Sequence, residues 1–362
     1  MKPVTLAVSF LLAGCMGVAP ETAEVAPAAT AAPAAIRGVH HILITVSDID
    51  DTMAFYGQAV PYELVERTTV PAATMPAAVL AKRSGLVEVA LIRTPTVFLE
   101  LLDIDPARKA APERRSVAGP GYTHICFQTP MANPGYDKFK AIGLSMLSRG
   151  SKPIDLGGYG VTYAYGFDPD GIMIEMEQLA PEVLASQGER GRRRSQFPAW
   201  PTHIANVTGD KAAMVNFYSR VLGFAPRREM PLTKRKTFDD VVDIDDIELS
   251  ASWYDAGNFE LEFWHYAHPV TPLQRAERTF DRIGYGAIVF EVTDLAGTVA
   301  RLEREGIKFA GPAFDRGGFR TRYARDPEGN VLGFTQNVTA GADRSIDRML
   351  WVNGAESAPP RT

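Results

Sequence analysis

The feature that most constrains the fold of this chain is an internal repeat whose two copies lie 162 residues apart. One copy opens with His41-Ile-Leu-Ile-Thr-Val-Ser-Asp48 and the other with His203-Ile-Ala-Asn-Val-Thr-Gly-Asp210. In each copy a glutamate follows 59 residues after the histidine, at Glu100 and at Glu262. Self-similarity at a fixed period indicates a duplicated structural unit. A chain of 362 residues is long enough for two such domains.

Each copy has a second half with a pattern of its own. The second half begins with His124-Ile-Cys-Phe in one copy and with Ala287-Ile-Val-Phe in the other. Both halves end in a tight turn and a strand, Asp168-Pro-Asp-Gly and Asp326-Pro-Glu-Gly, in which Pro fixes φ and Gly supplies a positive φ. The chain therefore divides into four quarters, which we number as modules one to four.

Within each quarter the pattern predicts a strand, a helix and three further strands. Asp48, Asp210 and Asp294 each precede apolar residues at helical spacing, so we expect a capped helix after each of them. Gly223 is expected to end the second of these helices. The sequence thus predicts an α+β fold built from four βαβββ modules.

Each of the two copies also carries a Phe-Tyr pair, Phe55-Tyr56 and Phe217-Tyr218. Four such modules, with the His-x4-Val-x-Asp opening, this Phe-Tyr pair and the Asp-Pro-Asp-Gly-x3-Glu ending, resemble the vicinal-oxygen-chelate superfamily. This superfamily includes glyoxalase I, extradiol dioxygenases, epimerases and bleomycin- or fosfomycin-resistance proteins, and the resemblance covers about residues 37 to 338. It implies two tandem domains, 37–180 and 200–338, joined by a linker at 181–199. A polar tail is expected at 339–362.

The resemblance also implies a metal site, because members carry one ligand on the first strand of a module and another on the last. Carried over to this chain, it implies one divalent ion, Zn²⁺, Ni²⁺, Co²⁺, Mn²⁺ or Fe²⁺, held by His41, Glu100, His124 and Glu175. Glu100 is in addition flanked by Leu99 and Leu101, and a buried carboxylate of this kind needs a cation. Module four has Ala287 and Gly333 at the two ligand positions, so the second domain is expected to be a degenerate half-site.

A different pairing of modules would change the ligand set. If module two pairs with module three, the complete set is His124, Glu175, His203 and Glu262. The linker at 181–199 and the duplication of a whole domain favour pairing module one with module two. Under that pairing Glu175 is the first candidate to leave the metal and move a proton, and Glu100 is the second.

Three functions fit these residues. The first is a glyoxalase- or epimerase-like isomerase or lyase that acts on a small oxygen-bearing substrate. The second is an Fe(II) extradiol-type dioxygenase of catechols; such enzymes typically add a histidine that is missing from residues 154–163, although Tyr165 is present. The third is a non-catalytic protein that binds a small molecule, with Trp253 and Trp264 either lining a cleft or packing in the core.

The N-terminal sequence predicts that the protein is located in the cell envelope. Lys2 precedes a short apolar run that ends in Leu12-Ala13-Gly14-Cys15, which resembles a bacterial lipobox. This implies a signal peptide at 1–14, a lipid on Cys15 and an Ala- and Pro-rich tether at 15–36. The protein is therefore expected to face the periplasm, with the membrane as partner through its lipid anchor.

The net charge argues against a nucleic-acid-binding protein, and the cysteine content argues against cysteine chemistry. The net charge of −5 shows no basic stripe for nucleic acid, and the run of arginines at 190–194 is expected to be a solvated part of the linker. Cys126, the second of two cysteines, is expected to be a buried thiol without chemistry.

Overall fold

The computed structural model describes residues 36–104, 114–339 and 344–349, and these described residues all belong to one compact unit. Module one contributes β1 (Ile36–Thr45), α1 (Ile49–Gly57), β2 (Glu63–Pro71), η1 (Ala72–Thr74), β3 (Leu86–Arg93) and β4 (Phe98–Asp103). Module two contributes β5 (Gly121–Pro130), α2 (Gly135–Ala141), β6 (Ser145–Met146), β7 (Ile154–Asp155), β8 (Val161–Phe167) and β9 (Met173–Leu179).

The second half of the chain repeats this order. Module three contributes β10 (Trp200–Val207), α5 (Lys211–Leu222), β11 (Arg228–Lys234), α6 (Lys236–Val242), β12 (Glu248–Asp255) and β13 (Glu260–His268). Module four contributes β14 (Gly284–Val292), α7 (Leu295–Arg304), β15 (Phe314–Arg316), β16 (Phe319–Arg325) and β17 (Val331–Asn337). Outside the modules lie α3 (Pro181–Ser186), α4 (Glu189–Arg194) and η2 (Ile346–Arg348). The predicted α+β fold of four βαβββ modules is confirmed.

The helix caps form as the sequence predicts. The carboxylates of Asp48, Asp210 and Asp294 accept hydrogen bonds from backbone N–H groups three residues ahead, and each bond is 3.0 Å long. Gly223 ends α5 with a φ of 81°, a conformation that only glycine adopts without strain.

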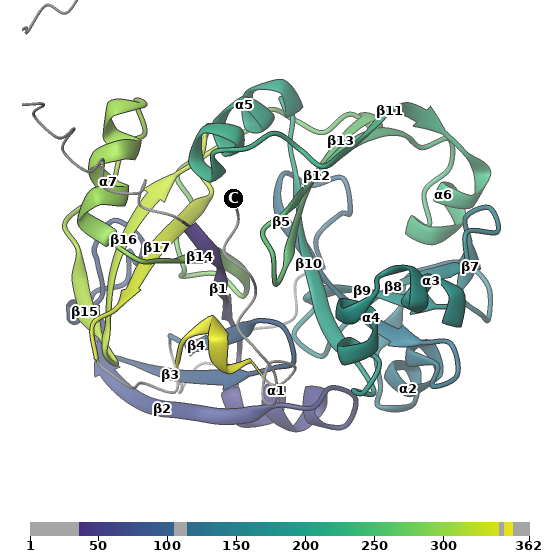
Figure 1. The fold of residues 1–362 in the computed structure, drawn as a ribbon, viewed down its shortest axis with the longest axis horizontal. Coiled ribbons are helices and arrows are strands. Elements are labelled where there is room, and N and C mark those ends of the chain that lie inside the picture. The colour runs from purple at the N-terminus through teal and green to yellow at the C-terminus, as the bar shows by residue number, and fades with distance from the viewer. Residues whose placement is uncertain (1–35, 105–113, 340–343, 350–362) are drawn as a thin grey trace, which may run out of the picture. The chain divides into compact units, whose positions relative to one another are not determined.

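The strands form two curled sheets (Figure 1). Sheet A runs in the order β15-β16-β17-β14-β1-β4-β3-β2, and sheet B runs β11-β12-β13-β10-β5-β9-β8-β6, with β7 beside β8. β1 pairs antiparallel with β14, and β5 pairs antiparallel with β10. Modules one and four therefore build sheet A, and modules two and three build sheet B.

This pairing corrects the prediction that modules one and two share a sheet. The residues expected to be an open linker form α3 and α4 instead, and β10 then pairs beside β5 in sheet B. Arg194, expected to be solvated, is buried and donates to the carbonyl oxygen of Asn258. The Asn258 side chain in turn bonds the carbonyl oxygens of Val39 and Thr96, which belong to module one.

The largest apolar core joins the two sheets. It contains buried residues of β1, β4, β14 and β17 from sheet A, of β5, β9, β10 and β13 from sheet B, and of helices α1, α2, α5 and α7. The Tyr122 hydroxyl on β5 donates to the carbonyl oxygen of Val331 at the start of β17, which links the sheets across this core. Alternation along each strand leaves the opposite face of each sheet free for a site.

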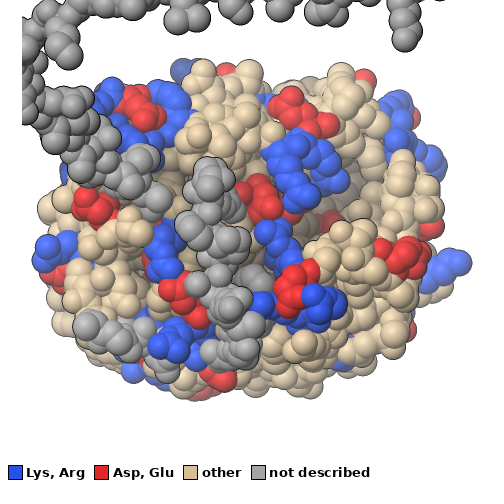
Figure 2. Space-filling view, in the orientation of Figure 1, with Lys and Arg blue, Asp and Glu red and all other residues tan. Residues whose placement is uncertain are grey.

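The surface carries interspersed charges of both signs on the face drawn in Figure 2, in keeping with the small net charge. No stripe of a single sign appears on that face.

Candidate metal centre

The four central strands of sheet B carry the four ligand-type side chains of one candidate metal centre. They lie side by side in the order β13, β10, β5, β9, and they supply Glu262, His203, His124 and Glu175 respectively. All four side chains are buried, and one ligand atom from each lies within 4.8 Å of the others. Two imidazoles and two carboxylates therefore converge on one point.

The strand register explains this convergence. Ala205 on β10 lies opposite Glu262 on one side and His124 on the other, so these three residues form a row across one face. In the next row on the same face, Cys126 on β5 lies between His203 and Glu175. The small side chains of Ala205 and Cys126 leave room for the longer side chains to meet above them.

The distances between the ligand atoms are short. His203 Nε2 lies 2.8 Å from Glu175 Oε2 and 3.4 Å from Glu262 Oε2. His124 Nε2 lies 3.5 Å from Glu175 Oε2. Nδ1 of His124 lies 3.1 Å from the Thr123 hydroxyl, an acceptor that would leave the proton on Nδ1 and the lone pair of Nε2 facing the centre. The set matches the nitrogen and oxygen donors that Zn²⁺ and its neighbours in the first transition row prefer.

The electrostatics of the site favour a cation. Burial alone would lower the pKa of His203, but Glu262 and Glu175 outweigh it and raise this pKa to about 10. Burial would raise the pKa of Glu175, and its hydrogen bonds to His124 and His203 reverse that effect and hold the pKa low. Both carboxylate partners thus favour positive charge at the point where the four side chains meet.

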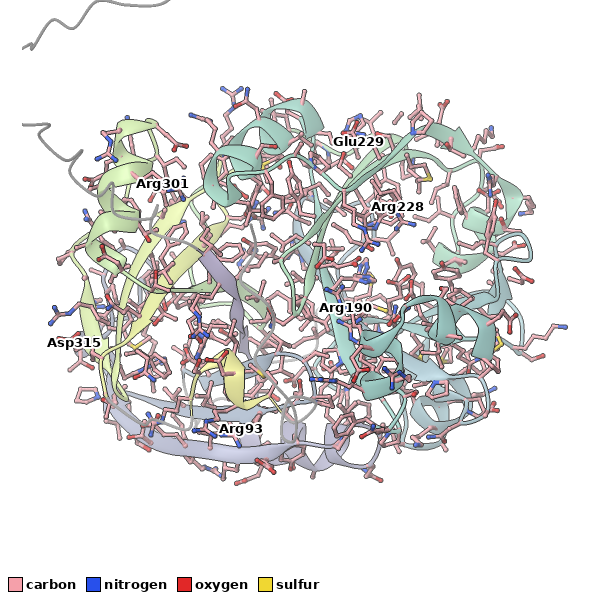
Figure 3. All side chains as sticks on the ribbon, in the orientation of Figure 1. Arg93, Arg190, Arg228, Glu229, Arg301 and Asp315 are labelled. Carbon is pink, nitrogen blue, oxygen red and sulfur yellow. The ribbon has the colours of Figure 1, made fainter. Side chains whose placement is uncertain are left out.

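Two tryptophans support one of these ligands. The indole N–H groups of Trp253 and Trp264 donate to the two oxygens of Glu262, at about 2.5 Å and 2.7 Å. Neither residue was predicted to act in this way, although strand alternation places Trp253 opposite Glu262 on the same face. The guanidinium of Arg228, labelled in Figure 3, lies 3.8 Å from the centre of the Trp253 ring.

Further residues near the centre had no predicted role. The Tyr165 hydroxyl lies 3.4 Å from His124 Nε2. Glu177 lies two residues after Glu175 on the same strand, and burial, followed by the charge of Glu175, raises its pKa to about 7. The Glu-x-Glu spacing on a strand is the signal that could have identified it. Burial raises the pKa of the Cys126 thiol, so it stays protonated as a small buried side chain.

His41 and Glu100 do not join this site. They lie on β1 and β4 of sheet A, whereas His124 and Glu175 lie in sheet B, so the predicted set of four is not brought together. The Glu100 carboxylate is instead in close contact with the guanidinium of Arg316, whose positive charge replaces that of a metal ion. The secondary role predicted for Glu100, as a group that leaves the metal and moves a proton, therefore loses its structural basis.

His41 and Glu100 form a half-site in sheet A, and module four lacks the two further ligands that would complete it. Ala287 and Gly333 stand at the two positions of module four, as the sequence indicates. A Cβ atom on Gly333 would come within 2.9 Å of the Tyr323 ring, so this ring fills the space that a glutamate would need.

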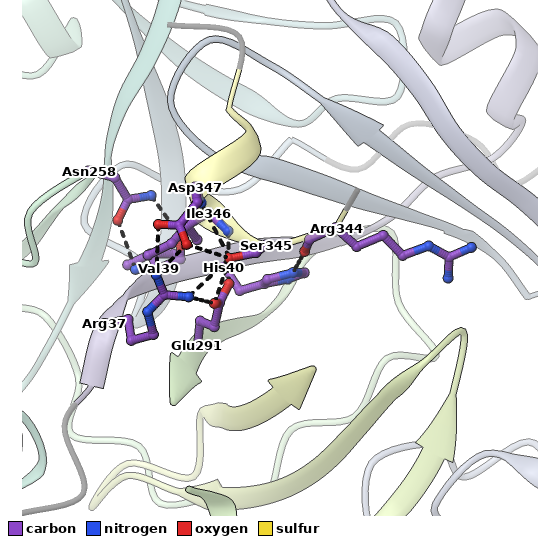
Figure 4. Close-up of polar contacts among 9 residues, drawn as sticks. All are labelled: Arg37, Val39, His40, Asn258, Glu291, Arg344, Ser345, Ile346 and Asp347. Carbon is purple, nitrogen blue, oxygen red and sulfur yellow. Dashed lines mark hydrogen bonds and ion pairs between the residues drawn. The ribbon is translucent and has the colours of Figure 1, made fainter. Parts of the chain in front are cut away.

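A chain of hydrogen bonds sets the proton positions at this half-site. His40 Nε2 lies 2.6 Å from the carbonyl oxygen of Arg344, a contact shown in Figure 4, and must donate to it. His40 Nδ1 then accepts from His41 Nδ1 at 2.7 Å, which leaves His41 Nε2 without a proton. This nitrogen faces Glu100 Oε1 at 3.9 Å, and neither atom has a hydrogen-bond partner among the described residues.

The segment that supplies Arg344 was expected to be part of a polar tail. Residues 344–349 instead pack against sheet A, where the Ile346 N–H and the Ser345 hydroxyl both donate to Glu291, as Figure 4 shows. The Arg344 side chain bonds Glu66, and Met349 is buried.

The predicted lipidation site Cys15, the signal peptide and the tether lie outside the described residues, apart from Ile36, which begins β1. Among the helices of the described residues, none is both long and apolar enough to cross a membrane.

A family model matches two long stretches of this chain. The family model described as Glyoxalase/Bleomycin resistance protein/Dioxygenase superfamily matches residues 38–176 and 200–334. Each match supplies one module to each sheet. A search of curated proteins found no match.

Solved structures share the fold. Glyoxalase I from Zea mays is 16% identical, with a TM-score of 0.55 over 83% of this chain and 92% of that chain. A putative dioxygenase from Bacillus subtilis is 12% identical, with a TM-score of 0.52 over 87% of this chain and 90% of that chain. At these identities the likeness concerns the fold alone.

Proposed function

We propose that this chain, which belongs to the Glyoxalase/Bleomycin resistance protein/Dioxygenase superfamily, is a metal-dependent isomerase or lyase that acts on a small oxygen-bearing molecule. The observation that carries the proposal is the convergence of two imidazoles and two carboxylates, all buried, on one point in sheet B. Zn²⁺, Ni²⁺, Co²⁺, Mn²⁺ and Fe²⁺ all suit this donor set. Such an ion polarises a substrate carbonyl or hydroxyl oxygen and stabilises the negative charge that develops there.

The two carboxylates have different surroundings and therefore different tasks. Glu262 accepts hydrogen bonds from two indole N–H groups, which fix its position. Glu175 is bonded by the two histidines of the site itself. Glu175 is thus the carboxylate that can turn toward the substrate, take a proton from carbon and return it to a neighbouring atom.

We expect the apolar walls of the site to keep water away from this transfer. Tyr165, Met173 and Tyr266 are buried and belong to one apolar cluster beside the ligands. Charge–dipole interactions act more strongly in such surroundings than in water.

A second candidate function is an Fe(II)-dependent dioxygenase of catechols. One observation favours it: the Tyr165 hydroxyl lies 3.4 Å from a ligand histidine, where a phenol can donate to a substrate oxygen. Oxygen uptake separates the two functions. Protein loaded with Fe²⁺ consumes O₂ with a catechol under the second proposal, whereas under the first it converts α-hydroxycarbonyl compounds without consuming O₂.

We also propose that the protein is anchored to the bacterial envelope and faces the periplasm, on the strength of Leu12-Ala13-Gly14-Cys15. Labelled palmitate should be incorporated into the full chain and not into a Cys15→Ser variant. Equal labelling of both, or labelling of neither, would refute the anchor.

The duplication supplies a matched control for the metal site. His203 and His41 are equivalent residues of the two copies, each on the first strand of its module. We expect about one divalent ion per chain by elemental analysis, lost in His203→Ala and kept in His41→Ala. If no metal is found in protein prepared without chelators, the enzymatic proposal fails. If His41→Ala loses the ion and His203→Ala keeps it, the assignment to sheet B is wrong.

A further inference from the structure

Arg228 is an exposed cation held beside the candidate metal centre. Its guanidinium carbon lies 3.8 Å from the centre of the Trp253 ring, and the N–H of that same ring donates to Glu262. The register repeats this connection, because Arg228 on β11 lies opposite Trp253 on β12, and Trp253 lies opposite Glu262 on β13. One aromatic ring therefore separates the arginine from a metal ligand.

Within the described residues, Arg228 forms no ion pair, whereas the charged groups around it have polar partners. Arg227 and Arg190 both pair with Asp255, and Glu229 accepts a hydrogen bond from the Ser252 hydroxyl. The guanidinium of Arg228 is fixed by stacking on a buried aromatic ring, and its five N–H donors stay available. Figure 3 labels Arg228, Arg190 and Glu229 in this part of the molecule.

The duplicated half-site shows that the fold does not require this arrangement. The offset of 162 residues relates Arg228 to Glu66, which has the opposite charge, and Trp253 to Leu91. The equivalent register in sheet A pairs Glu66 with Leu91 and Leu91 with Glu100. There the Glu66 carboxylate is bonded by Arg344. The unpaired cation on an aromatic ring occurs in the copy that has the complete ligand set.

We propose that Arg228 binds an anionic group of the substrate, a carboxylate or a phosphonate, while the oxygen atoms that react lie at the metal centre. A guanidinium presents paired N–H donors that match the two oxygens of such a group. The two ligand carboxylates balance a divalent ion, so Arg228 adds the positive charge that a monoanionic substrate needs. This inference rests on the proposed function and names the substrate class for the same site.

The test separates chelation from recognition of the anion. Titration calorimetry on the metal-loaded protein would compare acetohydroxamate, which chelates and is neutral, with two hydroxamates that also carry a carboxylate or a phosphonate. In the wild type we expect at least one anionic probe to bind more tightly than acetohydroxamate. Loss of a charged hydrogen bond in Arg228→Gln should weaken that probe by about 10- to 100-fold and leave acetohydroxamate unchanged.

Two further variants complete the design. Arg227→Gln removes a neighbouring exposed arginine and should leave all three affinities unchanged, whereas Arg228→Lys keeps the charge and should recover part of the loss. Equal weakening of all three probes by Arg228→Gln, or no preference of the wild type for either anion, would overturn the inference. Absence of bound metal in the wild type would instead overturn the proposed function, and elemental analysis of each variant tells these failures apart.

Discussion

Replacing Arg316 by Met tests whether this arginine serves as the resident cation of sheet A. The Arg316 side chain is 19% exposed and the Glu100 side chain 8%, so solvent screens their contact only weakly. Removing one partner of a buried ion pair typically costs about 3–5 kcal/mol, because the other charge is left uncompensated. Glu100 is especially sensitive, since its second oxygen has no hydrogen-bond partner among the described residues. We expect Arg316→Met to lose about 3 kcal/mol of unfolding free energy in urea.

The double variant Arg316→Met/Glu100→Gln measures how much of this loss comes from the stranded charge. The glutamine is neutral, and its amide can donate toward His41 Nε2. Replacing both partners of a buried pair is often nearly neutral, so most of the lost stability should return. A double-mutant cycle that is additive would show that Arg316 and Glu100 do not stabilise each other.

The pH dependence of stability tests independently whether Arg316 lowers the pKa of Glu100. In the wild type, burial would raise the pKa of Glu100, but Arg316 and His41 outweigh it and lower this pKa. A carboxyl group whose pKa is lowered on folding stabilises the fold at pH values above its unfolded pKa of about 4.3. This stabilisation is lost as the pH falls through the folded pKa. Without Arg316 the pKa should rise, so the variant gains relative stability as Glu100 takes up a proton. The stability gap should narrow from pH 8 to pH 5, and a gap that is constant or widens would refute the reasoning.

Three further predictions concern stability. Burial lowers the pKa of His41 to about 3, so the free energy of unfolding should fall as the pH drops below the unfolded pKa of about 6.5. His41→Asn should make the free energy of unfolding depend less on pH, as measured by urea unfolding from about pH 7 to about pH 4. Asn258→Ala removes both donors to the carbonyl oxygens of Val39 and Thr96 and should cost about 2–4 kcal/mol, against no change for an exposed asparagine. Asp294→Ala removes the cap of α7 and should cost about 1 kcal/mol by thermal unfolding, whereas Asp294→Asn should cost much less.

The local structure and half of the site were predictable from the sequence. Capping aspartates, a helix-ending glycine and alternating strands act over a few residues, so Asp294 and Gly223 are identified without knowledge of their partners. His124 and Glu175 belong to a complete ligand set under either pairing of modules that was considered. The structure places both of them in sheet B, and their role as metal ligands stays a prediction.

The pairing of modules was not predictable in this way. Duplication makes His41 equivalent to His203 and Glu100 equivalent to Glu262, so a histidine and glutamate pattern alone fits two arrangements. Some of the contacts that join distant modules come from single side chains such as Tyr122 and Asn258, which have no periodic pattern in the sequence. The role of Arg316 could not be predicted from the sequence either, because an arginine before two glycines resembles an exposed turn.

Charge balance connects the two sheets and explains why they differ. Sheet B buries two ligand carboxylates, Glu175 and Glu262, at one point, and the proposed divalent ion neutralises both. Sheet A retains Glu100 as its only counterpart carboxylate, because Gly333 stands where the second would be, and a single guanidinium neutralises it. A divalent ion added to the half-site would meet Glu100 already paired with Arg316, and the positive charge of Arg316 would repel it. The expectation of one metal ion per chain thus rests on the number of carboxylates at the ligand positions of each sheet, two in sheet B and one in sheet A. Arg316→Met, which removes the resident cation, is the variant most able to change that number.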